Sequence, residues 1–413
     1  MVAEAMRNVK LKDVCERITV GHVGPMAAQY TSSGIPFLRS QNILPFSLNL
    51  EDIKYIPPEF HAKLRKSALH PGDVAVVRTG YPGTACVIPP IFPELNCADL
   101  VVITPSPLLN PYYLSAIFNS AWGVSSVAGS LVGVAQQHFN VGAARELKVS
   151  LPPRVVQDRI AGILSAYDDL IENSQRRIWI LETMARSLYR EWFVDFRFPG
   201  HEKVPRVASA LGKIPGGWAV QTVADSFEIS GGGTPARRNA SYWDSGSIPW
   251  FSPSHLTAAD TLFMDDSPEH ITAAGLANSS ANLFAPFSVM LTSRATIGAI
   301  AINTQAACTN QGFITCIPNK RVPLYFLYLW IRDNVPQFIR LASGATFKEI
   351  SRGVFRTINF VHPEESVVRR FESYLEPMGR RMLVMQRQVR NLRSTRDLLL
   401  PRLLSGQLAV KSN

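Results

Sequence analysis

Few residues of this chain have the types and spacing that catalysis requires. The run Gly231-Gly-Gly-Thr234 lacks the lysine of a phosphate-binding GxxxxGK[ST] loop, so we interpret it as a flexible turn. The eight histidines form neither an HxxxH nor an HExxH pattern, and the five cysteines form no CxxC pair. The sequence therefore predicts neither nucleotide hydrolysis nor a metal site.

One further string contains the residue types of a base-binding loop. Asn110-Pro-Tyr-Tyr113 is similar to the Asn-Pro-Pro-Tyr loop of amino-methyltransferases, but it lacks the second proline and no glycine-rich cofactor loop precedes it. A related string later in the chain reads Val322-Pro-Leu-Tyr325. Both strings are better interpreted as helix starts, because proline is favoured at the first helical position. These features favour a binding protein over a catalyst.

Composition and charge restrict the partners. The chain has 413 residues, of which 46% are hydrophobic and 18% charged, which is typical of a folded protein of two or three domains. It has 42 Lys and Arg against 32 Asp and Glu, and a net charge of +10 indicates a polyanionic partner. The scattered cysteines suit a reducing interior, and the N-terminus lacks an apolar core for secretion, so we expect a cytoplasmic protein.

The chain contains an internal repeat. A shift of 211 residues places Pro152, Val156, Arg159, Gln175 and Leu188 on Pro363, Val367, Arg370, Gln386 and Leu399. Shifts of up to 215 residues align three further strings: Gly34–Ile43 with Ser247–Leu256, Arg78–Gly83 with Ser293–Gly298, and Asn110–Leu114 with Val322–Phe326. The repeat predicts two similar halves, each a globular domain followed by a helical segment.

Each helical segment has a seven-residue apolar repeat. The first predicts a helix from Pro153 to Tyr189, about 55 Å long at 1.5 Å per residue. Its copy runs from Phe371 to Leu399, with a kink or break expected at Pro377. Two such stripes are most simply buried against each other as an antiparallel pair, although both helices could instead be core elements of their own domains.

The globular parts have mixed patterns. Short β-rich runs, punctuated by glycine and proline, occur at Asp73–Arg78, Leu100–Thr104, Val289–Ser293 and Phe313–Ile317. Helices are predicted at Pro111–Ser120 and Pro323–Asn334, and a linker at Phe198–Gly217. The predicted fold class is α+β: two similar mixed α/β domains separated by a long antiparallel two-helix coiled coil, with a pseudo-twofold internal repeat.

Several strings in this layout resemble the specificity (S) subunits of type I restriction-modification enzymes. They are Pro36-Phe-Leu-Arg-Ser-Gln-Asn-Ile43, Thr292-Ser-Arg-Ala-Thr-Ile-Gly298, Leu188-Tyr-Arg-Glu-Trp-Phe193 and Leu398-Leu-Leu-Pro-Arg-Leu-Leu-Ser-Gly-Gln-Leu408. The resemblance covers nearly the whole chain, and the last string, after a long helix, is the most specific.

The resemblance implies a domain plan. Target-recognition domain 1 would span residues 1–150 and a central helical spacer 151–198, followed by a linker at 199–217. Target-recognition domain 2 would span 211–360 and a C-terminal helical spacer 361–413. Each domain would read one half of a bipartite, asymmetric site on double-stranded DNA, and the helices would set the spacing.

The resemblance also implies partners, and it leaves the chemistry to them. Two methyltransferase (M) subunits would dock on the helices and carry S-adenosylmethionine. Restriction (R) subunits would add an activity that depends on ATP and Mg. This chain itself would bind no cofactor or metal and would be a non-catalytic recognition subunit.

Candidate DNA contacts follow from the side chains that can read base edges or hold phosphates. In the first domain they lie in three loops: Arg39, Gln41 and Asn42; Arg78, Thr79 and Tyr81; Gln136, Gln137 and His138. The matching loops of the second domain contain Ser252, Ser254 and His255; Thr292, Ser293 and Arg294; Thr346 and Lys348.

Two other functions are compatible with the layout. The chain could be a coiled-coil assembly scaffold without sequence-specific DNA binding, which the basic charge and the Arg, Gln and Asn loop positions disfavour. It could also be a methyltransferase with its own recognition domain, which the missing cofactor motifs disfavour.

Overall fold

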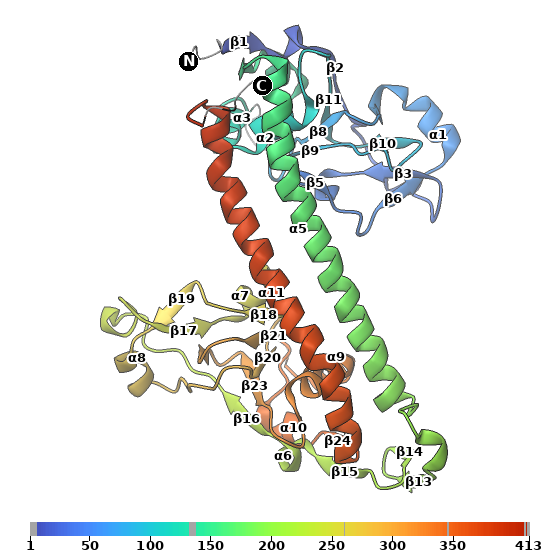
Figure 1. The fold of residues 1–413 in the computed structure, drawn as a ribbon, viewed down its shortest axis with the longest axis vertical. Coiled ribbons are helices and arrows are strands. Elements are labelled where there is room, and N and C mark those ends of the chain that lie inside the picture. Colours follow the sequence, from blue (N-terminus) through green and yellow to red (C-terminus); the bar gives the residue numbers. More distant parts are fainter. Residues whose placement is uncertain (1–5, 132–137, 260, 345–346, 409, 411–413) are drawn as a thin grey trace. The chain divides into compact units, whose positions relative to one another are not determined.

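The computed structural model describes residues 6–131, 138–259, 261–344, 347–408 and 410 (Figure 1). The chain divides into two compact units: unit 1 contains residues 1–173 and 390–413, and unit 2 contains residues 174–389. The division falls within the two long helices, α5 (Arg154–Tyr189) and α11 (Glu365–Leu404), so each unit contains one part of both.

Unit 1 is built on two four-stranded sheets. The first is antiparallel and has the order β2-β11-β8-β9. The second has the order β6-β3-β10-β7, with β3 and β10 parallel. Two strand pairs complete the unit, β1 with β12 and β4 with β5. The strands are β1 (Arg7–Lys10), β2 (Cys15–Val20), β3 (Ile35–Leu38), β4 (Ile43–Leu44), β5 (Ser47–Leu48), β6 (Lys54–Ile56), β7 (Ala68–Leu69), β8 (Val74–Val77), β9 (Ala85–Val87), β10 (Leu95–Cys97), β11 (Leu100–Pro105) and β12 (Lys148–Leu151).

The described residues of unit 1 form four short helices: α1 (Pro58–Lys63), α2 (Pro111–Asn119), α3 (Ala121–Ala128) and α4 (Val141–Glu146). The Asn110 Oδ1 atom accepts hydrogen bonds from the backbone N–H groups of Tyr112 and Tyr113, at 2.8 and 3.1 Å. Asn110 is therefore the N-cap of α2, and the interpretation of this string as a helix start is confirmed.

The two long helices pack together within unit 1. Ile160 and Leu164 of α5 share an apolar core with Leu400 and Leu403 of α11. Further along, the Arg396 guanidinium donates to Asp168 Oδ1 at 2.6 Å. Residue numbers rise on one helix as they fall on the other, so this stretch is antiparallel.

Unit 2 has a five-stranded sheet of order β16-β23-β20-β21-β18 and a three-stranded sheet of order β19-β17-β22. Its other strand pairs are β15 with β24 and β13 with β14. The strands are β13 (Arg206–Ser209), β14 (Gly212–Pro215), β15 (Ala219–Thr222), β16 (Glu228–Gly231), β17 (Ile248–Phe251), β18 (Phe263–Met264), β19 (Glu269–Ile271), β20 (Val289–Thr292), β21 (Ile300–Asn303), β22 (Cys308–Thr309), β23 (Phe313–Ile317) and β24 (Asn359–His362). Its helices are α6 (Val223–Ser226), α7 (Pro253–Ala259), α8 (Ala273–Ala277), α9 (Leu324–Leu341) and α10 (Arg352–Arg356).

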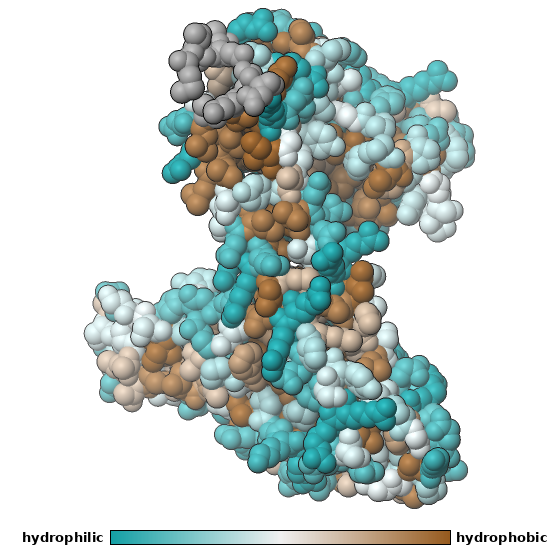
Figure 2. Space-filling view, in the orientation of Figure 1, coloured by the Kyte–Doolittle hydropathy of each residue, from teal (hydrophilic) through white to brown (hydrophobic). Residues whose placement is uncertain are grey.

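An aromatic cluster joins α5, α9 and α11 within unit 2. Phe371 of α11 has no exposed surface, and its ring lies 4.8 Å from Phe193 and 6.3 Å from Tyr189, centroid to centroid. Phe326 of α9 lies 4.7 Å from Phe193. Figure 2 shows long hydrophilic side chains over the long helices with hydrophobic surface between them, and Trp179 of α5 and Leu398 of α11 are exposed.

The two units carry the same strand order. The order β2-β11-β8-β9 in unit 1 corresponds to β16-β23-β20-β21 in unit 2, and β6-β3-β10 corresponds to β19-β17-β22. Elements also match in sequence: β3 begins at Ile35 and β17 at Ile248, while α5 begins at Arg154 and α11 at Glu365. The repeat predicted from the sequence is therefore confirmed.

Most predicted elements are confirmed, but the break at Pro377 is wrong. Helix α11 has 40 residues and runs through this position, although a proline removes one backbone hydrogen bond. The neighbouring Leu375 and Met382 are buried in the core of unit 2, and this packing holds the helix. The segment predicted as a linker carries the hairpin β13–β14, where Ile214 is buried.

The glycine run at the end of β16 is packed rather than flexible, which corrects the turn interpretation. A Cβ atom on Gly232 would lie 2.1 Å from the Asn310 carbonyl oxygen, and one on Gly233 would lie 2.2 Å from Ser280 Oγ. Gly231 meets only the Arg352 guanidinium, the end of a side chain that can move. Gly232 and Gly233 are needed because the backbone after β16 passes this close to its neighbours.

A half-buried carboxylate caps helix α9. Glu372 of α11 accepts hydrogen bonds from the backbone N–H groups of Tyr325 (3.0 Å) and Phe326 (3.2 Å). Burial is the largest influence and raises the pKa of Glu372 to about 7, while the two backbone hydrogen bonds oppose the rise.

This raised pKa makes the stability of unit 2 depend on pH. The contribution of Glu372 is fully present below its unfolded pKa of about 4.3 and is lost as the pH rises through about 7. Between pH 5 and pH 8, the wild type should lose roughly 2–3 kcal/mol of unfolding free energy relative to Glu372→Gln. Hydrogen exchange of the α9 amides at both pH values measures the difference, and parallel pH profiles for the two proteins would contradict it.

Candidate nucleic-acid interface

The loop after β8 presents three of the predicted contact residues of unit 1. The Arg78 guanidinium donates to Asp99 Oδ1 at 2.8 Å, and the Thr79 hydroxyl donates to Asp99 Oδ2 at 3.0 Å. Asp99 lies between β10 and β11 with a left-handed backbone, at a φ of 54°. Tyr81 is 84% exposed. One carboxylate therefore orients two polar side chains beside an exposed aromatic ring.

In each unit, a backbone hydrogen bond brings the second and third predicted loops together. The Phe139 N–H donates to the Arg78 carbonyl at 3.1 Å, and the Ile350 N–H donates to the Ser293 carbonyl at 3.0 Å. His138 and Lys348 therefore lie beside the second loop of their units. Gln136, Gln137 and Thr346 lie outside the described residues.

The first loop of unit 1 converges on Asp52. Arg39 donates to Asp52 Oδ2 at 3.0 Å and Gln41 at 3.3 Å. Hydrogen bonds from Lys54 and Arg39 lower the pKa of Asp52 to about 2, so this carboxylate is charged at neutral pH. Asn42 is completely buried and donates to the Asn49 carbonyl at 3.0 Å, so the structure gives it a loop-shaping role instead of an exposed edge.

The first loop of unit 2 has two hydroxyl groups near a histidine. Ser252 Oγ and Ser254 Oγ are 2.9 Å apart. His255 Nε2 lies 3.6 Å from Glu269, and burial lowers the pKa of His255, so the ring is mainly neutral at pH 7. Ser254 and Arg294 line one cavity of about 340 Å³, so the first and second loops of unit 2 meet.

The second loop of unit 2 differs from its counterpart. Thr292 and Ser293 are buried, and the Thr292 hydroxyl donates to the Thr296 carbonyl at 2.5 Å, so neither side chain offers an exposed edge. Arg294 is exposed and donates to Glu349 Oε2 through Nε (2.9 Å) and Nη2 (2.7 Å). Glu349 belongs to the third loop, so this ion pair also ties the two loops together.

A cleft of about 610 Å³ lies beside this loop. Its lining includes Arg294 and Gln311, which also line the smaller cavity, together with Arg352 and Arg356 of α10. Sequence reasoning missed Gln311, Arg352 and Arg356. The spacing of the two arginines, four residues apart, was an available signal because it places both on one side of a helical turn.

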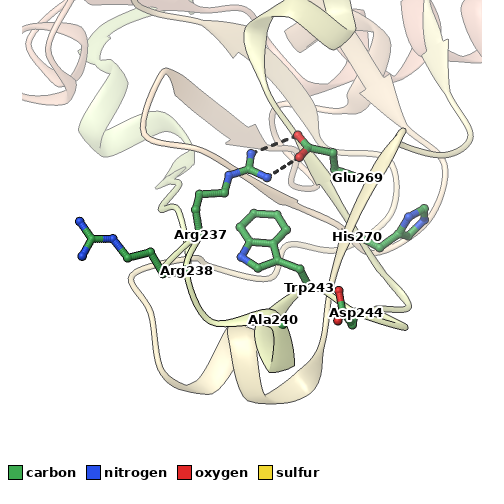
Figure 3. A pocket seen from close by; sticks show the side chains of 7 residues that line it. All are labelled: Arg237, Arg238, Ala240, Trp243, Asp244, Glu269 and His270. Atoms are coloured by element: carbon green, nitrogen blue, oxygen red, sulfur yellow. Dashed lines mark hydrogen bonds and ion pairs between the residues drawn. The ribbon is translucent and has the colours of Figure 1, made fainter.

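A second missed group lies around Arg237 (Figure 3). Its guanidinium lies 3.9 Å from the ring centroid of Trp243 and 4.7 Å from that of Trp250, and it pairs with both oxygens of Glu269. The Arg237 hydrogen bonds lower the pKa of Glu269. Arg238 points away from this group, beside a cavity of about 440 Å³. Arg237 is therefore fully engaged, whereas Arg238 remains exposed.

Thiols and metal ligands contribute little to these surfaces. The five cysteines are free, and burial raises the pKa of Cys86 and Cys308 to about 12. Among the described residues, no group of three or more His, Cys, Asp or Glu side chains could hold a metal ion. Within the same residues, no helix combines the length and apolar character needed to cross a bilayer.

Comparisons with known proteins point to one family. The family model described as "Type I restriction modification DNA specificity domain" matches residues 215–367. The specificity subunit of the type I restriction enzyme MjaIX of Methanocaldococcus jannaschii is 24% identical over 65% of this chain, and the match spans 62% of that protein. The putative MjaX specificity subunit of the same organism is 22% identical over 98% of this chain and 93% of its own length.

A solved structure shares the fold. The type I restriction-modification S subunit from M. genitalium matches with a TM-score of 0.64 at 14% identity, over 98% of this chain and 97% of that one. Three observations agree on this similarity. They are the strand order repeated in the two units, the domain match in unit 2 and the relative that matches over nearly the whole chain. Residues 215–367 therefore match the DNA specificity domain of type I restriction-modification enzymes, and the chain as a whole is similar to their specificity subunits.

Proposed function

We propose that this chain supplies the DNA sequence specificity of a type I restriction-modification complex and performs no catalysis itself. The observation that carries the proposal is that two units with the same strand order present different polar side chains at matching loops. Unit 1 presents Arg78 and Thr79 on Asp99, whereas unit 2 presents Arg294 on Glu349. Two readers that share a fold and differ at the surface suit an asymmetric bipartite site.

The domain plan and partners follow from this role. Target-recognition domains at 1–150 and 211–360 would each read one half-site, and the helical regions at 151–198 and 361–413 would set the spacing and dock two M subunits. A repeated chain offers two similar surfaces, so two copies of one partner can bind with pseudo-twofold symmetry. S-adenosylmethionine would bind the M subunits, and ATP and Mg the R subunits, in the cytoplasm.

Selection from random-sequence duplexes tests the proposal. The full chain is purified from its host together with the methyltransferase that stays bound to it. This complex should enrich a DNA motif of two short elements separated by a fixed gap. Native mass spectrometry should show two M subunits for each copy of this chain. A continuous motif would contradict bipartite reading, and no enrichment at all would favour the scaffold alternative.

Arg78 and Arg294 should each contribute to one half-site. Arg78→Ala or Arg294→Ala should weaken cognate binding by about 1–3 kcal/mol at fixed salt, because a bidentate contact to a base would be lost. Each variant should relax the enriched motif in one element only. Arg7→Ala, at the exposed start of β1, is a matched control for charge and should keep the motif. An unchanged motif in Arg78→Ala would remove this residue from the interface.

A further inference from the structure

The cleft beside α10 in unit 2 has an excess of positive charge. Three arginines line it, Arg294, Arg352 and Arg356, against one carboxylate, Glu349. Glu349 is already paired with Arg294. Arg352 and Arg356 are exposed, and no hydrogen bond or ion pair joins either side chain to another of the described residues. Two guanidinium groups therefore line the cleft without a counter-charge.

The Arg352 guanidinium lies against the backbone of Gly231. A Cβ atom on Gly231 would lie 2.2 Å from Arg352 Nη1 and 2.6 Å from its Cζ atom. The guanidinium thus lies against the bare backbone at the end of β16, in space that any other residue would occupy. This contact restricts the side chain before a ligand arrives, which lowers the entropy cost of binding.

Unit 1 lacks this arrangement. In the matching strand pairs, Gly231 lies opposite Ile314 of β23 and Val20 lies opposite Val101 of β11, so Val20 takes the place of Gly231. Helix α4 begins with Val141 where α10 begins with Arg352. The glycine and the first arginine are therefore replaced together, whereas Arg145 takes the place of Arg356.

We propose that Arg352 and Arg356 bind backbone phosphates of duplex DNA, next to the bases that the Arg294 loop contacts. The proposal rests on the DNA-reading function above and adds the residues that hold the backbone. Guanidinium groups bind phosphate oxygens through paired N–H donors, and such contacts position the protein without reading sequence. Arg294 and Gln311 line both this cleft and the cavity at Ser254, so the phosphate site is continuous with the candidate base-reading surface.

The salt dependence of binding tests this proposal. With the full chain and its retained methyltransferase, the affinity for cognate and random-sequence duplexes is measured at several salt concentrations. Arg352→Gln and Arg356→Gln should each lower the affinity for both duplexes by the same factor. Each should also reduce the slope of log affinity against log salt by about 1. Lys213→Gln, on the exposed hairpin β13–β14, carries the same charge change outside the cleft and should keep the wild-type slope.

A second variant separates placement from charge. Gly231→Ala leaves the net charge unchanged but adds a methyl group where the Arg352 guanidinium lies. It should lower the affinity for both duplexes equally and reduce the salt slope by up to about 1. The midpoint of thermal unfolding should not change. Wild-type slopes in Arg352→Gln and Arg356→Gln would overturn the proposal while leaving the DNA-reading function intact.

Two further outcomes would also overturn it. Loss of cognate binding alone would make these arginines base readers instead of phosphate ligands. Stabilisation of the wild type, but not of the variants, by inorganic pyrophosphate without any change in DNA binding would assign the cleft to a small phosphate compound. If the wild type enriches no DNA, the proposed function fails, and this inference fails with it.

Discussion

Phe371→Ala should lower the free energy of unfolding of unit 2 by about 3–5 kcal/mol, the largest effect expected of a single apolar truncation here. Phe371 is fully buried, and its ring contacts Phe193, in the helical turn Arg190–Val194 that follows α5, and Phe326 of α9. The truncation removes apolar contacts on three elements at once. It also leaves a cavity, because neighbours held by several other aromatic rings cannot close around it.

Hydrogen exchange measures this loss in the unit where it occurs. The slowest amides of β23 and α9 should exchange faster in Phe371→Ala, while the β11 amides of unit 1 keep their wild-type rates. Val384→Ala is a matched control, because this residue lies on the same helix and is 54% exposed. A change below about 1 kcal/mol in Phe371→Ala would mean that the aromatic cluster is not a stabilising centre of unit 2.

Arg17→Met should destabilise unit 1 by about 3–5 kcal/mol, because it leaves a buried carboxylate without its counter-charge. Asp73 is 1% exposed and lies 2.7 Å from Arg17 Nη2. Arg17 also donates to the Thr104 hydroxyl at 3.1 Å and to the Ala68 carbonyl at 3.1 Å. The substitution therefore breaks contacts that join β2 to three other segments of unit 1.

The control for this variant makes the same change of charge at an exposed arginine. Arg145→Met, on the exposed side of α4, should change stability by less than about 0.5 kcal/mol. Exchange of the β11 amides gives both values. In the double variant Arg17→Met with Asp73→Asn, part of the lost stability should return, because the buried group is then neutral. Equal losses in the single and double variants would contradict an electrostatic cause.

Elements were predictable from the sequence where one local pattern decides the structure. The heptad pattern predicted a helix from Pro153 to Tyr189, and α5 runs from Arg154 to Tyr189. Apolar runs predicted β8, β11, β20 and β23 for the same reason. β8 and β20, for example, are buried along their whole length. The helix break predicted at Pro377 does not occur, because tertiary packing outweighs one missing backbone hydrogen bond.

Site residues were less predictable because side-chain type does not reveal exposure. Asn42, Thr292 and Ser293 have the polar groups of base readers, yet all three are buried and their loops are shaped by internal hydrogen bonds. Partners far along the chain, such as Arg17 with Asp73, carry no local signal at all. The DNA contacts of exposed residues such as Arg294 and Tyr81 stay predictions until the experiments above are done.

The paired hydrogen bonds between loops have a consequence for protein engineering. Because the Phe139 N–H bonds to the Arg78 carbonyl and the Ile350 N–H bonds to the Ser293 carbonyl, each reading surface is a composite of two segments that lie far apart along the chain. A graft that moves one segment from unit 2 into unit 1 would separate Arg294 from Glu349. Chimaeras with transferred specificity therefore require both segments to be transplanted jointly, as a single cassette.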